Sequence, residues 1–95
     1  MEDLKIEWDG RKATANLQKH GVSFDEAVTA FSDEKGRLVA DPDHSDGEDL
    51  YILFGMSWSL LVIVVCHCYR KETEVIRIIS ARKATKTERA QYGVR

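Results

Sequence analysis

Arginines in the C-terminal third are the residues of this 95-residue chain best suited to chemistry. Arg77 lies between Val75 and Ile79 in a β-rich run, and Arg82 closes that run. An arginine flanked by apolar neighbours costs free energy unless it is paired or needed. A guanidinium group matches phosphate oxygens and stabilises the charge that develops during phosphoryl transfer. These positions, with Arg70 at a predicted hairpin turn, therefore indicate a phosphate clamp.

A structural role for Arg77 is the alternative, and residue type alone ranks it first. It would consist of an ion pair to Glu7, Glu48 or Glu74. His67 would add proton transfer to a clamp, although a lone histidine on a strand is more often a packed side chain.

Neither a metal site nor a nucleophilic triad is predicted. The segment 41–49 holds His44 among five acidic residues, but Asp46 occupies the place of the glycine in a calcium loop. Cys66 and Cys68 have no second ligand pair at zinc spacing. Strand alternation also sends His67 to the face opposite these thiols. We therefore expect no metal, no cofactor and two reduced cysteines.

The segment 60–82 must position the arginines, and it carries the strongest β signal of the chain. Six apolar residues, 60–65, predict a strand buried on both faces. The chain returns through 75–80 after a polar break, which is typical of an antiparallel hairpin. This hairpin is expected to form the centre of a sheet.

The N-terminal third is predicted to form a short strand and two helices. Residues 5–8 alternate as a strand does, and Asp9 and Gly21 are suited to cap a helix over 10–20. Its inward stripe is expected to contain Ala13, Leu17 and His20.

A capping box, in which Ser23 and Glu26 each bond to the other's amide, begins the second helix. The remaining segments predict strands at 37–40 and 50–56, a turn at 57–59, and a terminal helix opened by a second capping box of Thr85 and Glu88. The order β-α-α-β-β-β-β-α predicts a small α+β fold with an antiparallel sheet and two helices on one face.

Composition indicates one ordinary globular domain over residues 1–95, with 43% apolar and 32% charged residues. The apolar run is too short to span a bilayer, and the N-terminus is not a signal peptide. We expect a cytoplasmic protein without a membrane partner.

Residues 70–95 hold eight basic and three acidic side chains, whereas residues 1–69 hold six basic and thirteen acidic ones. This asymmetry favours a localised anion-binding face, with a solvated helix as the alternative.

Three stretches in series carry a family resemblance across nearly the whole chain. They are IEWD (6–9) with NLQKHGVSFDEA (16–27), DPDHSDGE (41–48), and IRIISARKAT (76–85) with ERAQY (88–92). Together they resemble the BrnT toxins of bacterial type II toxin–antitoxin systems. Gly10 departs from the family, which often has proline there, and this concerns only the helix entry.

The resemblance implies a RelE-like fold and a small ribonuclease that cuts RNA without a metal and blocks translation. It also implies a BrnA-like antitoxin of the ribbon-helix-helix type, a complex that binds operator DNA, and a possible dimer within that complex. The inferred reaction is attack by the substrate's own 2′-hydroxyl, which gives a cyclic phosphate. The expected catalytic residues are Arg77, Arg82, Arg70 and His67, and the expected RNA-backbone contacts are Lys19, His20 and Lys83.

Two other classes of function stay open at this point. A non-catalytic nucleic-acid- or antitoxin-binding module would bind RNA in a salt-dependent manner without cutting it. A structural protein with paired arginines would lose stability, and no activity, when Arg77 is replaced.

Overall fold

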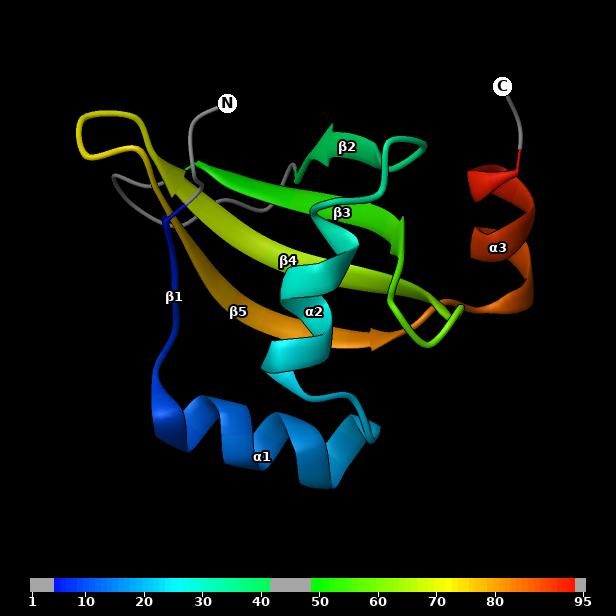
Figure 1. The fold of residues 1–95 in the computed structure, drawn as a ribbon, viewed down its shortest axis with the longest axis horizontal. Helices are drawn as coiled ribbons and strands as arrows, with labels where there is room; N and C mark the ends of the chain where they lie inside the picture. The colour runs from blue at the N-terminus through cyan, green and yellow to red at the C-terminus, as the bar shows by residue number, and fades with distance from the viewer. Residues whose placement is uncertain (1–4, 42–48, 94–95) are drawn as a thin grey trace.

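In the computed structural model, which describes residues 5–41 and 49–93, helices pack around one five-stranded sheet (Figure 1). The strands are β1 (Lys5–Glu7), β2 (Arg37–Ala40), β3 (Leu50–Met56), β4 (Val62–Arg70) and β5 (Val75–Lys83). The helices are α1 (Gly10–His20), α2 (Phe24–Ala30) and α3 (Lys86–Tyr92). The predicted element order and α+β class are confirmed.

The sheet has the strand order β1-β5-β4-β3-β2, so the predicted hairpin of β4 and β5 lies at its centre. The pairs among β2, β3, β4 and β5 are antiparallel. β1 instead pairs in parallel with β5 at the edge, a contact that the sequence analysis did not predict. A β-bulge interrupts the central pair: Cys66 lies opposite Ser80, His67 lies opposite Ile78, and Ile79 has no counterpart.

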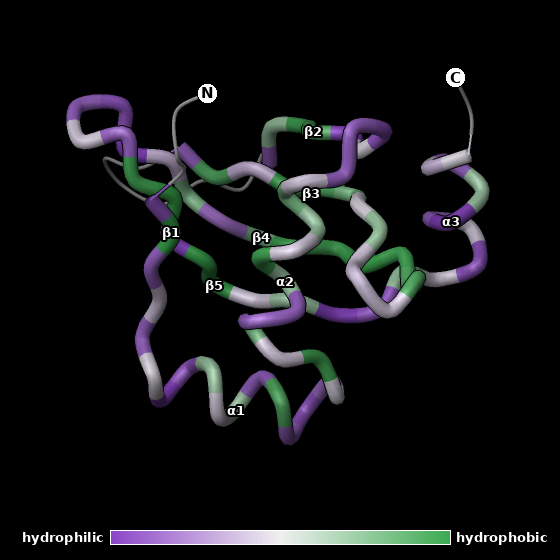
Figure 2. The backbone as a smooth tube through the Cα atoms, in the orientation of Figure 1, coloured by the Kyte–Doolittle hydropathy of each residue, from purple (hydrophilic) through white to green (hydrophobic). Residues whose placement is uncertain are grey.

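The core lies between α2 and one face of the sheet. Its fully or almost fully buried members are Val22, Phe24, Ala27, Ala30, Leu53, Ile63, Val65, Ile78 and Ala81. The hydrophobic stretch of β4 crosses behind α2 (Figure 2). Burial of these side chains supplies most of the driving force for folding.

The apolar run 60–65 is not a strand throughout, which corrects the sequence analysis. β4 begins at Val62, and Leu60 lies in the preceding turn with its side chain 77% exposed and φ at 65°. The Ser57 amide donates to the Leu61 carbonyl over 2.8 Å, which closes the turn before the strand begins. Only the second half of the run is buried on both faces.

Only one of the two hydrogen bonds of the predicted capping box of α2 is present. The Ser23 hydroxyl accepts from the Glu26 amide over 3.0 Å, as predicted. The Glu26 carboxylate does not reach back, because it accepts hydrogen bonds from the hydroxyls of Ser57 and Ser59. This carboxylate therefore ties the β3–β4 turn to the start of α2.

Asn16 is the buried residue of α1. Of the predicted inward stripe, Ala13 packs against the core and His20 is half-buried, whereas Leu17 is 50% exposed. The Asn16 amide nitrogen donates to the carbonyls of Val22 and Ala81, and its oxygen accepts from the Ala81 amide. β1 pairs with β5 only as far as Arg77. The Asn16 side chain thus takes the place of a neighbouring strand where β5 extends beyond β1.

Gly55 marks the close approach of β3 to α2, and we predict that Gly55→Ala destabilises the fold. A Cβ atom there would lie 2.9 Å from the Ala30 carbonyl oxygen and 3.2 Å from its Cβ. Backbone atoms cannot yield as a flexible side chain does, so we expect a loss of about 2 kcal/mol in the free energy of unfolding. Urea unfolding measures it, with Gly10→Ala as the control because that position has open space. Equal stability of the two variants would contradict the prediction.

Candidate active site

The sheet brings the three predicted arginines to one face. Arg77 lies opposite Cys68 and Arg82 lies opposite Val64, and residues directly opposite each other share a face. Alternation along β4 puts Arg70 on the same side as Cys68. Because Val65 belongs to the core under α2, these arginines face away from that helix. We call this side the arginine face.

The β-bulge at Ile79 puts Arg77 and Arg82 on the same face of the sheet. Residues five apart on a regular strand point to opposite faces. The extra residue shifts the alternation by one, so that both side chains reach the arginine face. Their partners on β4 are four residues apart, which separates the two Cα atoms by about 13 Å.

Arg77 forms an ion pair with Glu7 of β1, with 2.8 Å between Nη1 and Oε2. Arg77 therefore has the ion pair that the structural alternative predicted, and Glu7 is one of the three partners named for it. The Arg77 side chain is 32% exposed and that of Glu7 is 46% exposed. The pair lies within reach of solvent, so an anion can approach the guanidinium without unfolding the sheet.

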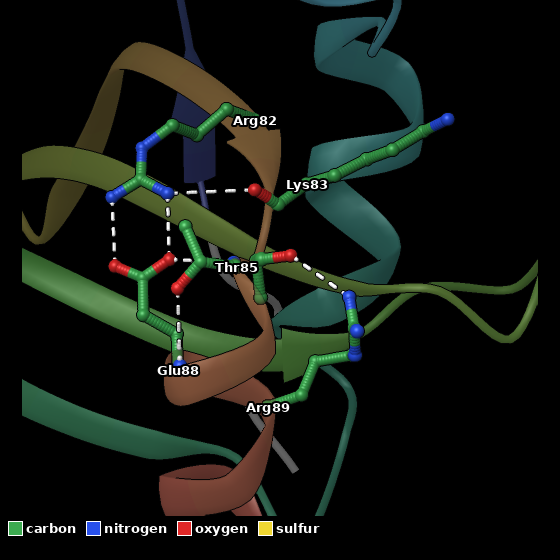
Figure 3. A network of polar contacts seen from close by, with 6 residues as sticks. Arg82, Lys83, Thr85, Glu88 and Arg89 are labelled. Atoms are coloured by element: carbon green, nitrogen blue, oxygen red, sulfur yellow. Dashed lines mark hydrogen bonds and ion pairs between the residues drawn. The ribbon is translucent and has the colours of Figure 1, made fainter.

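Arg82 binds Glu88 through two parallel hydrogen bonds of 2.7 and 2.9 Å (Figure 3). The same carboxylate accepts from the Thr85 amide, and the Thr85 hydroxyl accepts from the Glu88 amide. This confirms the second capping box. Arg89 adds a hydrogen bond of 3.2 Å to the Ala84 carbonyl. The network fixes α3 to the end of β5, at the border of the arginine face.

The ion pair of Arg82 and Glu88 predicts that the free energy of unfolding decreases as pH falls from 4.5 to 2. Hydrogen bonds, above all from Arg82, lower the pKa of Glu88 from 4.5 to about 2. A depressed pKa contributes stability that is present above the ordinary pKa and is lost as pH falls through the folded one. We expect Glu88→Gln to lower the free energy of unfolding at pH 7 by about 1 kcal/mol, allowing for solvent screening.

The measurement is urea unfolding from pH 7 to pH 2 of the parent and Glu88→Gln. The difference between them should shrink as pH falls from 4.5 to 2, because Glu88 takes up its proton near pH 4.5 in the unfolded chain and only near pH 2 in the folded protein. Glu72→Gln, in the exposed β4–β5 turn, is the control and should change little. A difference between parent and Glu88→Gln that is independent of pH would contradict the assignment.

His67 lies on the other face of β4, which divides the predicted catalytic set. The side chain is 3% exposed, and its Nδ1 lies 3.2 Å from the Val65 carbonyl oxygen. Phe31 contacts its ring edge-on, with ring centroids 4.9 Å apart. Burial lowers the pKa of His67, which favours the neutral imidazole. The predicted separation of His67 from the thiols is confirmed, and it also separates this imidazole from a phosphate held on the arginine face.

The residues predicted to contact the RNA backbone also lie apart from the three arginines. Lys19 and His20 occupy the last turn of α1. Lys83 lies opposite Ile63, a core residue, so it belongs to the helix side. Its side chain points away from Arg82 in Figure 3.

Glu7 is one of the three carboxylates predicted as an ion-pair partner of Arg77, and the structure confirms this pair. The parallel pairing of β1 with β5 brings it opposite Arg77. The alternation of residues 5–8 predicted that Glu7 faces away from Ile6, but it did not predict which strand Glu7 meets.

Cys66 and Ser80 lie between the positions of Arg77 and Arg82 on the arginine face. Burial raises the pKa of the Cys66 thiol, so it is poorly suited to act as a nucleophile.

Metal ligands do not gather in the part of the chain that the structure describes: residues 5–41 and 49–93 contain no group of three His, Cys, Asp or Glu side chains suited to hold an ion. His44 lies outside these residues. Among the described helices, none is long and apolar enough to cross a membrane.

A comparison with known protein families identifies the family of this chain. The model of BrnT, a ribonuclease toxin of type II toxin–antitoxin systems, matches residues 8–88. The chain belongs to the BrnT family. It is therefore a ribonuclease toxin of a type II system, with RNA as its substrate and an antitoxin as its partner. The match includes Arg70, Arg77 and Arg82. No curated protein matches the chain.

Proposed function

We propose that this BrnT-family toxin is a metal-independent endoribonuclease that stops translation, and that it cuts RNA on the arginine face. The observation that carries the proposal is the shared face of Arg70, Arg77 and Arg82, which depends on the bulge at Ile79. A ribonuclease needs cationic groups where charge develops on the phosphate, and guanidinium forks supply them.

The proposed reaction is attack by the 2′-hydroxyl of the substrate on the adjacent phosphorus. A bond forms between O2′ and phosphorus, the bond from phosphorus to O5′ breaks, and a 2′,3′-cyclic phosphate results. Glu7 takes the 2′-hydroxyl proton, because its carboxylate lies 2.8 Å from the guanidinium of Arg77 that would bind the phosphate. Water returns a proton to O5′. Arg70 and Arg82 neutralise the phosphorane with Arg77.

Glu7 replaces His67 as the proposed base because a phosphate on the arginine face cannot reach an imidazole buried on the other face. Lys19, His20 and Lys83 are proposed to bind phosphates of the same RNA outside the cleaved bond. Such contacts add affinity and little sequence information.

The proposed partner is a BrnA-like ribbon-helix-helix antitoxin that covers the arginine face. The toxin–antitoxin complex binds operator DNA, and the toxin is a possible dimer within it. The toxin acts in the cytoplasm. Membership of a type II family supports an antitoxin. The many half-buried apolar residues of the arginine face, among them Ile52 and Phe54, support a protein partner there.

Controlled expression of the chain tests this function. We expect growth arrest and fragmented RNA with the parent, rescue by the antitoxin encoded beside it, and neither effect with a folded Arg77→Ala/Arg82→Ala variant. The second candidate is a non-catalytic binding module, which the ion pairs of both arginines favour. Intact RNA with salt-dependent RNA binding would support that module and refute the ribonuclease.

A further inference from the structure

A cleft of about 540 Å³ opens on the helix side of the sheet, away from the arginine face. Its walls include Phe31, Leu38, Tyr51, His67, Tyr69 and Ile76. Aromatic rings thus gather on a protein whose substrate is a nucleic acid. None of the roles assigned above uses this cleft.

His67 supplies a polar group to the lining of the cleft, which also includes Asp33. The Val65 carbonyl can only accept a hydrogen bond, so Nδ1 must be the protonated nitrogen of the neutral ring. Nε2 is then an acceptor, and it has no partner among the described residues. A ligand that fills the cleft would gain by donating an N–H group to it.

The rings around His67 are arranged for stacking. Tyr51 lies nearly parallel to the imidazole, with 6.1 Å between ring centroids and 29° between planes. Phe31, at the C-terminal end of α2, contacts the imidazole edge-on. Tyr69 is 39% exposed, so its ring is available at the mouth of the cleft. A planar ring entering here meets aromatic side chains and the Nε2 acceptor of His67.

We propose that this cleft binds a base of the RNA substrate by stacking on Tyr51 and Tyr69 and by an N–H donated to His67 Nε2. The inference rests on the proposed ribonuclease function. Tyr69 and Arg70 are neighbours on β4, and they point to opposite faces. The cleft and the arginine face therefore adjoin at the hairpin end of the sheet. A single strand that passes this end places a phosphate at Arg70 and a base in the cleft.

Nuclear magnetic resonance of the intact chain, labelled in histidine and tyrosine, tests the proposal with three probes. Uridine 5′-monophosphate has a single ring N–H donor, its 3-methyl derivative lacks that donor, and ribose 5-phosphate has no base. We expect the first to shift the His67, Tyr51 and Tyr69 ring signals, the second to bind about fivefold more weakly, and the third to leave these signals unchanged. Equal shifts with all three probes would overturn the proposal.

Tyr69→Ala should weaken binding of the uridine probe by about fivefold or more through lost stacking. Trp58→Ala, at an exposed aromatic residue outside the cleft, should leave the affinity unchanged. Parental affinity in a folded Tyr69→Ala variant would overturn the proposal. So would ring signals that respond to the antitoxin and not to the uridine probe, because the cleft would then be a protein-docking site.

Cleavage of RNA by the same samples separates this inference from the proposed function. Base binding at the cleft without any cleavage would refute the ribonuclease mechanism and leave the cleft assignment in place. Cleavage without a response of His67, Tyr51 and Tyr69 to the base would do the reverse.

Discussion

Arg77→Ala is expected to lower the rate of RNA cleavage by about 10²- to 10³-fold, the usual loss when one donor to a developing oxyanion is removed. Arg77 is central because it contacts the proposed base, Glu7, and lies on the arginine face. The measurement is single-turnover cleavage of an RNA oligonucleotide by purified toxin. Arg77→Lys should recover only part of the rate, since an ammonium keeps the charge but not the planar fork.

Arg11→Ala is the matched control, because Arg11 is an exposed arginine at the start of α1 and has no proposed role. It should cut RNA as the parent does. Parental cleavage by a folded Arg77→Ala protein would remove this residue from the mechanism and leave it only the ion pair to Glu7.

Asn16→Ala is expected to lower the free energy of unfolding by about 3 kcal/mol. The substitution removes three hydrogen bonds, and it leaves the Ala81 amide and two carbonyls buried without their partner. A domain of this size has only about 5–10 kcal/mol to lose. Urea unfolding at pH 7 measures the change.

Gln18→Ala, on the exposed side of the same helix, is the control and should stay within about 0.5 kcal/mol of the parent. If Asn16→Ala were equally mild, the amide would not be the group that joins α1 to the edge of β5. Water would then satisfy the Ala81 backbone instead.

The elements that the sequence predicted are those with local signals. The α1 bounds follow from the Asp9 and Gly21 caps, and α3 follows from the Thr85–Glu88 box. Asn16 was missed because an apolar stripe is judged by residue type, whereas a buried amide depends on a β5 edge that lies 65 residues away. The parallel pairing of β1 is equally non-local.

The candidate site could be predicted by residue type but not by geometry. Counting along a regular strand would have put Arg77 and Arg82 on opposite faces, and nothing local to the sequence marks Ile79 as the bulged residue. Alternation did predict that His67 faces away from the thiols. It could not show that the arginines join the thiol side, because that depends on the register of β4 against β5.

The most direct test of the central claim is cleavage of an RNA oligonucleotide by the purified toxin in the presence of a chelator. A matched oligonucleotide with a 2′-deoxy group at the cleaved nucleotide is tested beside it. We predict that the first is cut to a 2′,3′-cyclic phosphate and that the second stays intact, because the nucleophile is the substrate's own hydroxyl. Cleavage that requires an added divalent metal, or that proceeds on the deoxy substrate, would contradict the mechanism.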